Sequence, residues 1–368
     1  MTALSIGDIR TLRLNSLLLA DHDYTTAEQV VSWFAAMQAQ DLASVKWSLG
    51  IRLPELTETD IDEAFERGDI LRTWPMRGTI HLIPSRDARW MLEATGTRQL
   101  KGVEKRWDYL GLDRATVERA GEVLAGALAD GGRLTRAQAA TALNEAGIET
   151  SSQRLYHLLW HTSQIGITCI GPTIDKEQTF VLLDDWAPDQ RELSGEDAIT
   201  ELAWSYIRSH GPVPATDFAG WAGIPVTQAR KAFAANDGRA VTVESDFGEL
   251  WLATDLLERA GEVADRDTGA PDVWALPGFD EFMLGYKDRR AFLDDGHLDL
   301  VVPGSNGMFR STVVVSGAVV GVWKRTISKT KVKVDVEPFK KLTKAQYSDL
   351  VLSLERYGRY LGVPIVLS

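Results

Sequence analysis

Two glutamines separated by one residue, Gln38 and Gln40, are the side chains whose types and spacing most suggest chemistry. In a helix, residues two apart point in nearly opposite directions, whereas in an extended chain they point to the same side. An amphipathic helix is expected from Thr26 to Met37, just before the pair, and Asp41 is a good N-cap for a following helix. We therefore expect the helix to break here and both amides to face one spot.

Three stretches of the chain repeat one order of expected elements, three helices followed by a two-stranded hairpin. The clearest copy lies at residues 118–183, the next at 194–253, and a copy with one additional helix at 10–83. This order is the winged-helix pattern, in which the third helix can enter a DNA groove and the hairpin forms the wing. The glutamine pair lies between the second and third helices of the first copy.

The pattern changes after about Pro271, where short β-branched runs replace helical periodicity. Strands are expected at residues 300–302, 311–315, 319–324, 331–336 and 363–367, with a helix capped by Thr343 before the last one. The predicted fold class is α+β, with three tandem winged-helix domains followed by a small β-rich, barrel-like domain. Their predicted bounds are 1–108 for the winged helix with Gln-Ala-Gln, 109–190 and 191–262 for the next two, and 263–368 for the C-terminal domain.

Composition indicates a globular protein of several domains. The chain has 368 residues, of which 44% are hydrophobic and 25% charged, and this length suggests two to four domains. No apolar run approaches the ~20 residues that cross a bilayer, and no basic segment followed by an apolar one begins the chain. Cys169 is the single cysteine, which excludes an internal disulfide and favours a buried thiol. We expect a cytoplasmic protein with no membrane partner.

The net charge of −12 argues against nucleic acid only as a whole-chain sum, because binding depends on local charge. Basic residues outnumber acidic ones between residues 71 and 106 and between 321 and 344. Such segments are compatible with a DNA groove, although solvated faces are their commoner cause. The candidate phosphate contacts are Arg77, His81, Lys324, Arg325, Lys329, Lys331 and Lys333; a structural role is the alternative for His81, given its position on a strand.

Four motifs, spread in order over most of the chain, resemble one family. They are FAAMQAQD (34–41), LRTWPMRGTIHLIP (71–84), LPGFDEFMLGYKDR (276–289) and GVWKR (321–325). The chain is similar to the AlkZ/YcaQ-type winged-helix DNA glycosylases, bacterial enzymes that excise bulky N-alkylated purines and unhook some crosslinks. The signature of that family is glutamine, a hydrophobic residue, then glutamine or aspartate. The resemblance implies that Gln38 and Gln40 are catalytic.

Glutamine suits a reaction that needs no proton transfer from the enzyme, because its amide has no useful pKa. An N7-alkylated guanine already carries positive charge and leaves without protonation. What remains is to hold a water beneath C1′ and to stabilise an oxocarbenium-like transition state. Two amides can orient one water, which can be worth several orders of magnitude in rate. Asp41 is a rival for the water, but N-capping is favoured for it.

No metal or other cofactor is expected. His157 and His161 lie four residues apart on one helix, but no third ligand accompanies them. No lysine lies near the glutamines to form a Schiff base, which points to a monofunctional enzyme. Asp280 and Glu281 are adjacent carboxylates that are expected to play separate structural parts, although one could line the site.

The predicted function is hydrolysis of the N-glycosidic bond of N-alkylated purines, such as N7-alkylguanine, bulky or crosslinked, in double-stranded DNA. We expect a monomer, associated with the nucleoid of a bacterium. A non-catalytic winged-helix DNA-binding protein, regulatory or architectural, is the alternative. A protein–protein module is a third reading, since the chain is acidic and winged helices also serve that role.

Overall fold

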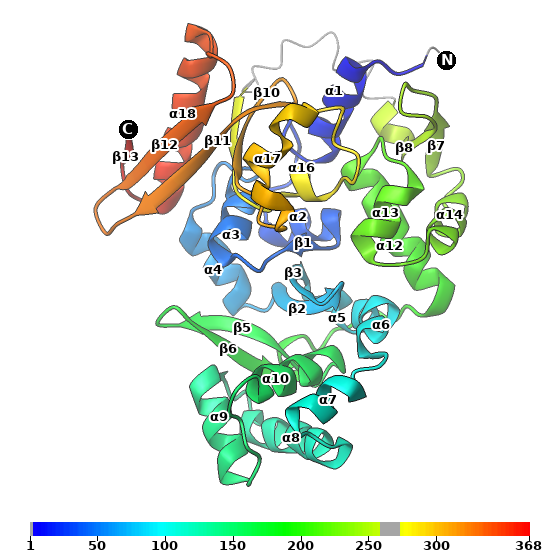
Figure 1. Cartoon of the computed structure of the whole chain (residues 1–368), viewed down its shortest axis with the longest axis vertical. Coiled ribbons are helices and arrows are strands. Elements are labelled where there is room, and N and C mark those ends of the chain that lie inside the picture. The colour runs from blue at the N-terminus through cyan, green and yellow to red at the C-terminus, as the bar shows by residue number, and fades with distance from the viewer. Residues whose placement is uncertain (1–2, 258–272) are drawn as a thin grey trace. The chain divides into compact units, whose positions relative to one another are not determined.

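The computed structural model describes residues 3–257 and 273–368. It is a mixed α+β structure with several sheets, which confirms the predicted class (Figure 1). The chain divides into two compact units, one made of residues 1–61 and 200–368 and the other of residues 62–199. The predicted four-domain boundaries stay a prediction, and each unit is described by itself below.

The glutamine pair belongs to the unit that is discontinuous in sequence. Its N-terminal helices begin at well-formed caps. The side chains of Ser5 and Thr26 each accept a backbone N–H, and their own backbone N–H groups donate to the side chain three residues on, which completes a capping box. The partner of Thr26 in this box is Gln29. The elements of this segment are α1 (Ile6–Ser16), α2 (Ala27–Phe34), β1 (Met37–Gln38), α3 (Leu42–Gly50) and the start of α4 (Glu58–Glu66).

The same unit continues with three helices and a hairpin, in the order expected from the sequence. The aromatic side chains of Tyr206, Phe218 and Trp221 pack together in its interior, with ring centroids 5.2–6.4 Å apart. These elements are α12 (Gly195–His210), α13 (Ala215–Ala222), α14 (Val226–Ala234), β7 (Ala240–Val243) and β8 (Leu250–Ala253).

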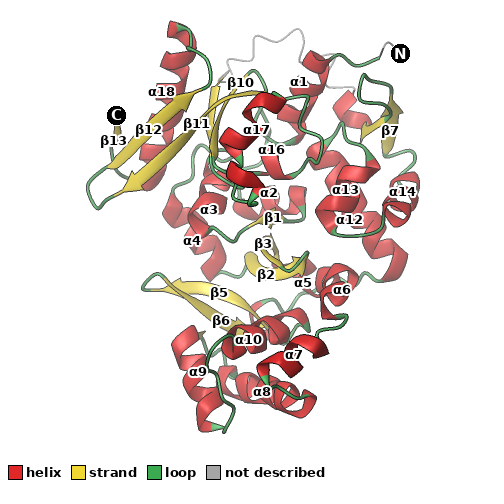
Figure 2. Ribbon diagram, viewed as in Figure 1, coloured by secondary structure: helices red, strands yellow, loops and turns green. Residues whose placement is uncertain are grey.

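A five-stranded sheet in the order β13-β12-β11-β10-β9 forms the C-terminal part of this unit, with helix α18 running alongside it (Figure 2). Neighbouring strands are antiparallel except β12 and β13. Barrel-like closure is not confirmed, since β9 and β13 are the two edges of this sheet in the described part of the chain. The elements are β9 (Val273–Leu276), β10 (Ser311–Val315), β11 (Ala318–Ile327), β12 (Val332–Pro338), α18 (Lys344–Leu361) and β13 (Ile365–Leu367).

Helix α3, which follows the glutamines, is fixed to this sheet by tryptophans. Trp47 on α3 donates its indole N–H to Ala275 O at 3.0 Å, and its ring lies 4.7 Å from that of Tyr357 on α18. Trp323 on β11 donates to Leu276 O at 2.8 Å. Because Trp47 and Trp323 are almost fully buried, these contacts set the position of α3 and of the loop before it.

One strand expected from the sequence is wrong. The run at residues 300–302 belongs to helix α17 (Leu298–Val301), which follows a 3₁₀ turn capped by Asp294 and stops before Pro303. A single helical turn buries Val301 as well as a strand would, and short apolar runs do not distinguish the two. Strand β9 was not expected, because all four of its residues are buried and show no alternation. Helix α16 (Glu281–Leu284) follows it.

The second unit, residues 62–199, joins two predicted hairpins in one sheet, in the order β3-β2-β5-β6-β4. Arg72 on β2 pairs with Ile170 on β5 and so connects the two hairpins. Its strands are β2 (Ile70–Met76), β3 (Thr79–Pro84), β4 (Leu134–Thr135), β5 (Thr168–Ile174) and β6 (Glu177–Leu182).

Helices surround this sheet, and a core that includes Trp107, Leu124 and Leu158 holds the larger ones together. The helices are α5 (Ala88–Met91), a π-helix (Leu92–Gly96), α6 (Thr97–Leu100), α7 (Glu104–Leu110), α8 (Arg114–Leu128), α9 (Arg136–Glu145), α10 (Arg154–Gln164) and α11 (Leu183–Trp186).

Candidate active site

The chain leaves helix α2 just before the glutamines and becomes extended. The helix ends at Phe34, three residues earlier than expected, and Ala35 adopts φ 62° and ψ −41°. A positive φ is uncommon for a residue with a side chain and is found where the surrounding structure imposes it. Ala35 is 3% exposed, so this turn is enclosed by its neighbours.

The extended backbone places the two amides on one side, as predicted. Met37 and Ala39 are buried, while Gln38 and Gln40 alternate with them. The side-chain Nε2 of Gln38 donates to Oε1 of Gln40 at 3.3 Å. The other amide atom of Gln38, its buried Oε1, has no hydrogen-bond partner within residues 3–257 and 273–368. The pair is thus held together, with one amide oxygen still able to accept a hydrogen bond.

Asp41 caps helix α3, the role favoured from the sequence. Its Oδ1 accepts from Ser44 N at 3.2 Å and its Oδ2 accepts from Ser44 Oγ at 2.9 Å. Both carboxylate oxygens are therefore engaged in starting the helix.

A buried carboxylate, Glu281, lies behind the glutamine loop and bonds to its backbone. Glu281 Oε1 accepts from Gln38 N at 3.1 Å, while Oε2 accepts from His210 Nε2 at 3.2 Å and from Trp221 Nε1 at 3.0 Å. Burial alone would raise the pKa of Glu281, but the hydrogen bonds from His210, Gln38 and Trp221, with the charge of His210, outweigh it and lower the pKa.

The neighbouring carboxylate, Asp280, serves a different partner. Arg52 on the C-terminal side of α3 binds it through two bonds, Nη1 to Oδ2 at 2.8 Å and Nη2 to Oδ1 at 3.0 Å, and Ser48 Oγ also donates to it. Burial would raise the pKa of Asp280, but the charge and hydrogen bonds of Arg52 lower it. The prediction of separate parts for the two carboxylates is confirmed, and the direct link from Glu281 to Gln38 is what sequence reasoning missed. In the sequence, this link was signalled only by the FDEF motif, residues 279–282 within the longer motif at 276–289.

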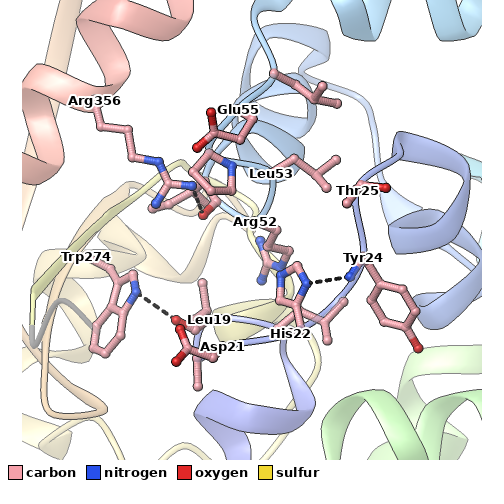
Figure 3. A pocket seen from close by; sticks show the side chains of 15 residues that line it. Leu19, Asp21, His22, Tyr24, Thr25, Arg52, Leu53, Glu55, Trp274 and Arg356 are labelled. Atoms are coloured by element: carbon pink, nitrogen blue, oxygen red, sulfur yellow. Dashed lines mark hydrogen bonds between the residues drawn. The ribbon is translucent and has the colours of Figure 1, made fainter. Parts of the chain in front are cut away.

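Arg52 also lines a pocket of about 360 Å³ in the same unit (Figure 3). The labelled side chains of His22, Tyr24, Trp274 and Arg356 surround it, with Trp274 Nε1 donating to Leu19 O at 3.2 Å. Burial lowers the pKa of Arg356 to about 10. Gln38 and Gln40 are not among the lining residues, so this pocket is separate from the pair.

The predicted basic cluster of the C-terminal sheet divides between two faces. Lys324 pairs with Asp335 across strands β11 and β12 at 3.6 Å, and Lys333 approaches the same carboxylate at 3.8 Å. Arg325 points to the opposite face, where its Nη2 donates to Ser44 Oγ at 3.3 Å. Exposed Lys324 and Lys333 therefore lie on one face of the sheet, and Arg325 lies on the other, beside the start of α3. Lys329 and Lys331 are also exposed and lie between the end of β11 and the start of β12.

Arg77 and His81 lie on the β2–β3 hairpin of the second unit. Arg77 is exposed at the turn with φ 54°, and its Nη2 is 3.4 Å from His81 Nε2. His81 is fully buried, and its Nδ1 is 2.9 Å from Thr79 O. Its surroundings fit the structural alternative better than a phosphate contact, which leaves Arg77 as the exposed cation of this turn.

The remaining reactive side chains show no catalytic arrangement. Among the described residues, no three His, Cys, Asp or Glu side chains gather in a way that could hold a metal ion. His157 Nε2 instead accepts from Arg106 at 3.2 Å. Burial raises the pKa of the Cys169 thiol, so it is held as an unreactive neutral group. No helix in the described ranges is both long and apolar enough to span a bilayer.

Comparisons with known proteins agree with these features. Residues 31–360 match the family model described as DNA glycosylase AlkZ-like. A Streptomyces sahachiroi protein named interstrand DNA cross-link repair glycosylase is 24% identical over 324 residues, 85% of each chain. The structure of Streptomyces sahachiroi DNA glycosylase AlkZ has the same fold, with a TM-score of 0.79 at 23% identity over 100% of both chains. The family resemblance read from the motifs is thereby confirmed, and the chain belongs to the AlkZ-like DNA glycosylases, enzymes that hydrolyse N-glycosyl bonds.

Proposed function

We propose that the chain is a monofunctional glycosylase that removes N-alkylated purines, including N7-alkylguanine and crosslinked purines, from duplex DNA. The observation that supports this proposal is the hydrogen bonding of the two glutamine amides. Gln38 and Gln40 bond to each other at 3.3 Å, while Gln38 Oε1 is buried with no partner in the described part of the chain. A buried amide oxygen needs a donor, and a water molecule can supply it.

The reaction asks little of the protein beyond orientation. The amide oxygen of Gln38 accepts a hydrogen bond from the water and so directs a lone pair of the water oxygen at C1′. As the water oxygen bonds to C1′, the C1′–N bond breaks and its electrons neutralise the cationic purine. The surplus proton passes to solvent, since an amide does not retain it at neutral pH. The amide dipoles also face the positive charge that develops on the sugar.

Binding to DNA is proposed to follow the winged-helix pattern. Two stretches support it with the order of three helices and a hairpin, α8–α9–α10–β5–β6 and α12–α13–α14–β7–β8. Arg77 and the exposed lysines Lys324, Lys329, Lys331 and Lys333 supply candidate phosphate contacts. The name of the Streptomyces sahachiroi relative supports crosslinked purines as part of the substrate range. We propose a monomer that acts on the bacterial nucleoid.

The test is single-turnover excision from duplex DNA that carries one bulky 7-alkylguanine. The Gln38→Ala/Gln40→Ala variant should lose about 100-fold or more in rate, with DNA affinity and thermal stability close to those of the unaltered protein. Excision at an unchanged rate would exclude the pair from catalysis. Tight binding without excision by the unaltered protein would instead favour the non-catalytic DNA-binding role.

A further inference from the structure

We propose that Glu281, itself fixed by His210 and Trp221, is a positioning residue that sets the catalytic direction of Gln38 through its backbone N–H. This inference rests on the proposed function, because it assumes that Gln38 orients the attacking water. Glu281 touches neither amide side chain in the contacts described above, and it acts through the peptide that carries one of them.

The geometry leaves the Glu281 carboxylate one orientation. Oε1 accepts from Gln38 N at 3.1 Å, and Oε2 accepts from His210 and Trp221 at 3.2 and 3.0 Å. The carboxylate is 2% exposed, and His210 and Trp221 are 0% and 2% exposed. Rotation of the carboxylate would break three bonds in a place where water cannot replace them. The group is therefore a fixed acceptor aimed at one backbone N–H.

The second layer of contacts fixes the imidazole in turn. Ser209 Oγ donates to Ser205 O at 2.6 Å and lies 2.8 Å from His210 Nδ1. On its other side the ring faces Glu281 through Nε2. Both ring nitrogens therefore have a partner, and these partners hold the plane of the imidazole from two sides. The His210 ring also stacks on Tyr206 at 4.5 Å.

The peptide held by this bond lies just beyond the end of helix α2. Ala35 leaves the helical conformation with a positive φ, and Met37–Gln38 is only two residues of extended chain. The Gln38 N–H is a backbone donor that must find a partner. Its orientation sets the direction of the Cα–Cβ bond and hence of the amide. A small rotation of this peptide would move the Gln38 side chain away from Gln40. It would also move it away from the attacking water of the proposed mechanism.

The neighbouring carboxylate shows that position in the FDEF motif alone does not give this role. Asp280 bonds to Arg52, Ser48 and Phe282 N, so it fastens its own segment to α3. Within residues 3–257 and 273–368, Glu281 is the residue of this motif that accepts a hydrogen bond from the glutamine loop. Asp280 thus stabilises the scaffold around α3, whereas Glu281 holds the peptide that carries Gln38.

The experiment compares Glu281→Gln, Trp221→Phe and the double variant Trp221→Phe/Glu281→Gln. In Glu281→Gln, the amide oxygen can accept from Gln38 N only if the amide NH₂ takes the place of Oε2. The NH₂ group then faces the indole N–H of Trp221, so two donors point at each other. Removing the indole N–H in the double variant relieves this conflict. The amide NH₂ can then donate to His210 Nε2, the ring nitrogen that faces it, when the imidazole proton is on Nδ1.

Single-turnover excision and DNA affinity are measured for each protein, with thermal unfolding as the folding control. Positioning predicts at least a 10-fold lower excision rate for Glu281→Gln at unchanged DNA affinity. Trp221→Phe should lose less, because Glu281 Oε1 can still accept from Gln38 N. The double variant should recover at least 5-fold over Glu281→Gln. A Glu281→Gln rate within 2-fold of the unaltered protein overturns the proposal. Absence of recovery in the double variant overturns it too.

Two further measurements keep the result interpretable. If Glu281→Gln does not fold, ¹⁵N-glutamine labelling of the unaltered protein tests the anchor directly. The Gln38 amide, assigned by its loss in Gln38→Glu, should be shifted downfield and protected from exchange, and a rapidly exchanging amide refutes the anchor. Gln38→Ala/Gln40→Ala is assayed in the same series. If that variant stays active, the proposed function fails, whereas its inactivity beside a fully active Glu281→Gln removes only the positioning role.

Discussion

Replacing Asp217 with asparagine should stabilise the protein at neutral pH and much less at acidic pH. Asp217 lies in the first turn of α13, is 3% exposed, and its Oδ2 has no hydrogen-bond partner in the ranges that the structure describes. Burial raises the pKa of Asp217 to about 6 although Arg13 opposes the shift. The residue lines a pocket of about 520 Å³ together with Lys287 and Arg289.

The size of the effect follows from the two pKa values. A group whose folded-state pKa is raised contributes stability that is fully present below its unfolded pKa of 3.8 and is lost as pH rises through about 6. At 1.36 kcal/mol per pKa unit, ionised Asp217 costs about 3 kcal/mol at pH 7.5 and about 1 kcal/mol at pH 4.5. Asp217→Asn removes this cost, so its gain over the unaltered protein should be about 2 kcal/mol larger at pH 7.5.

Urea unfolding at the two pH values measures this difference. Asp8→Asn is the matched control, because hydrogen bonds from Ser5 lower the pKa of Asp8 and its stabilisation is present at neutral pH and lost as pH falls. The two variants should therefore show opposite trends. The prediction fails if the difference in free energy of unfolding between Asp217→Asn and the unaltered protein is the same at both pH values. It also fails if this difference is smaller at pH 7.5 than at pH 4.5.

Two other predictions concern the supports of the site and its DNA contacts. Asp280→Asn should lower the free energy of unfolding by about 3–5 kcal/mol, because it leaves Arg52 charged and buried. The pKa of Asp280 is lowered in the folded protein, so its stabilisation is present at pH 7 and is lost as pH falls below 3.8. Urea unfolding midpoints should therefore differ between variant and unaltered protein at pH 7, and the difference should shrink at pH 3. Changing Lys324, Lys331 and Lys333 together to glutamine should weaken DNA binding. The slope of log binding constant against log salt concentration, measured by fluorescence anisotropy, should become shallower by up to ~0.9 per lost phosphate contact. An unchanged slope would mean that DNA binds elsewhere on the protein.

Local signals predicted the structure where the relevant contacts are local. Helices begin at Thr26 and Thr343, the residues at which the sequence placed their starts. The hairpins at β2–β3, β5–β6 and β7–β8 follow from alternation and turn residues. The extended Gln-Ala-Gln segment is also local, because a helix end and an N-cap enclose it. These features depend on residues only a few positions apart.

The missing parts depend on packing between distant segments. Strand β9 has no alternation because both of its faces are buried, and the run before Pro303 forms the single helical turn α17. Glu281 could be recognised as an acid in a motif, but no sequence pattern indicates that it bonds to Gln38. The pairing of Arg52 with Asp280 across 228 positions is of the same kind.

The bond between Glu281 and Gln38 spans 243 positions, and this has a consequence for how the enzyme is made. At about 5–20 residues per second, a ribosome needs roughly 12–50 s to add the anchor after the glutamine has been joined to the chain. Residues 62–199 are completed in that interval and form a unit with its own core. Under the proposed positioning role, a nascent chain carries both glutamines long before Glu281 can orient Gln38, and an interrupted translation product would be inactive in base excision.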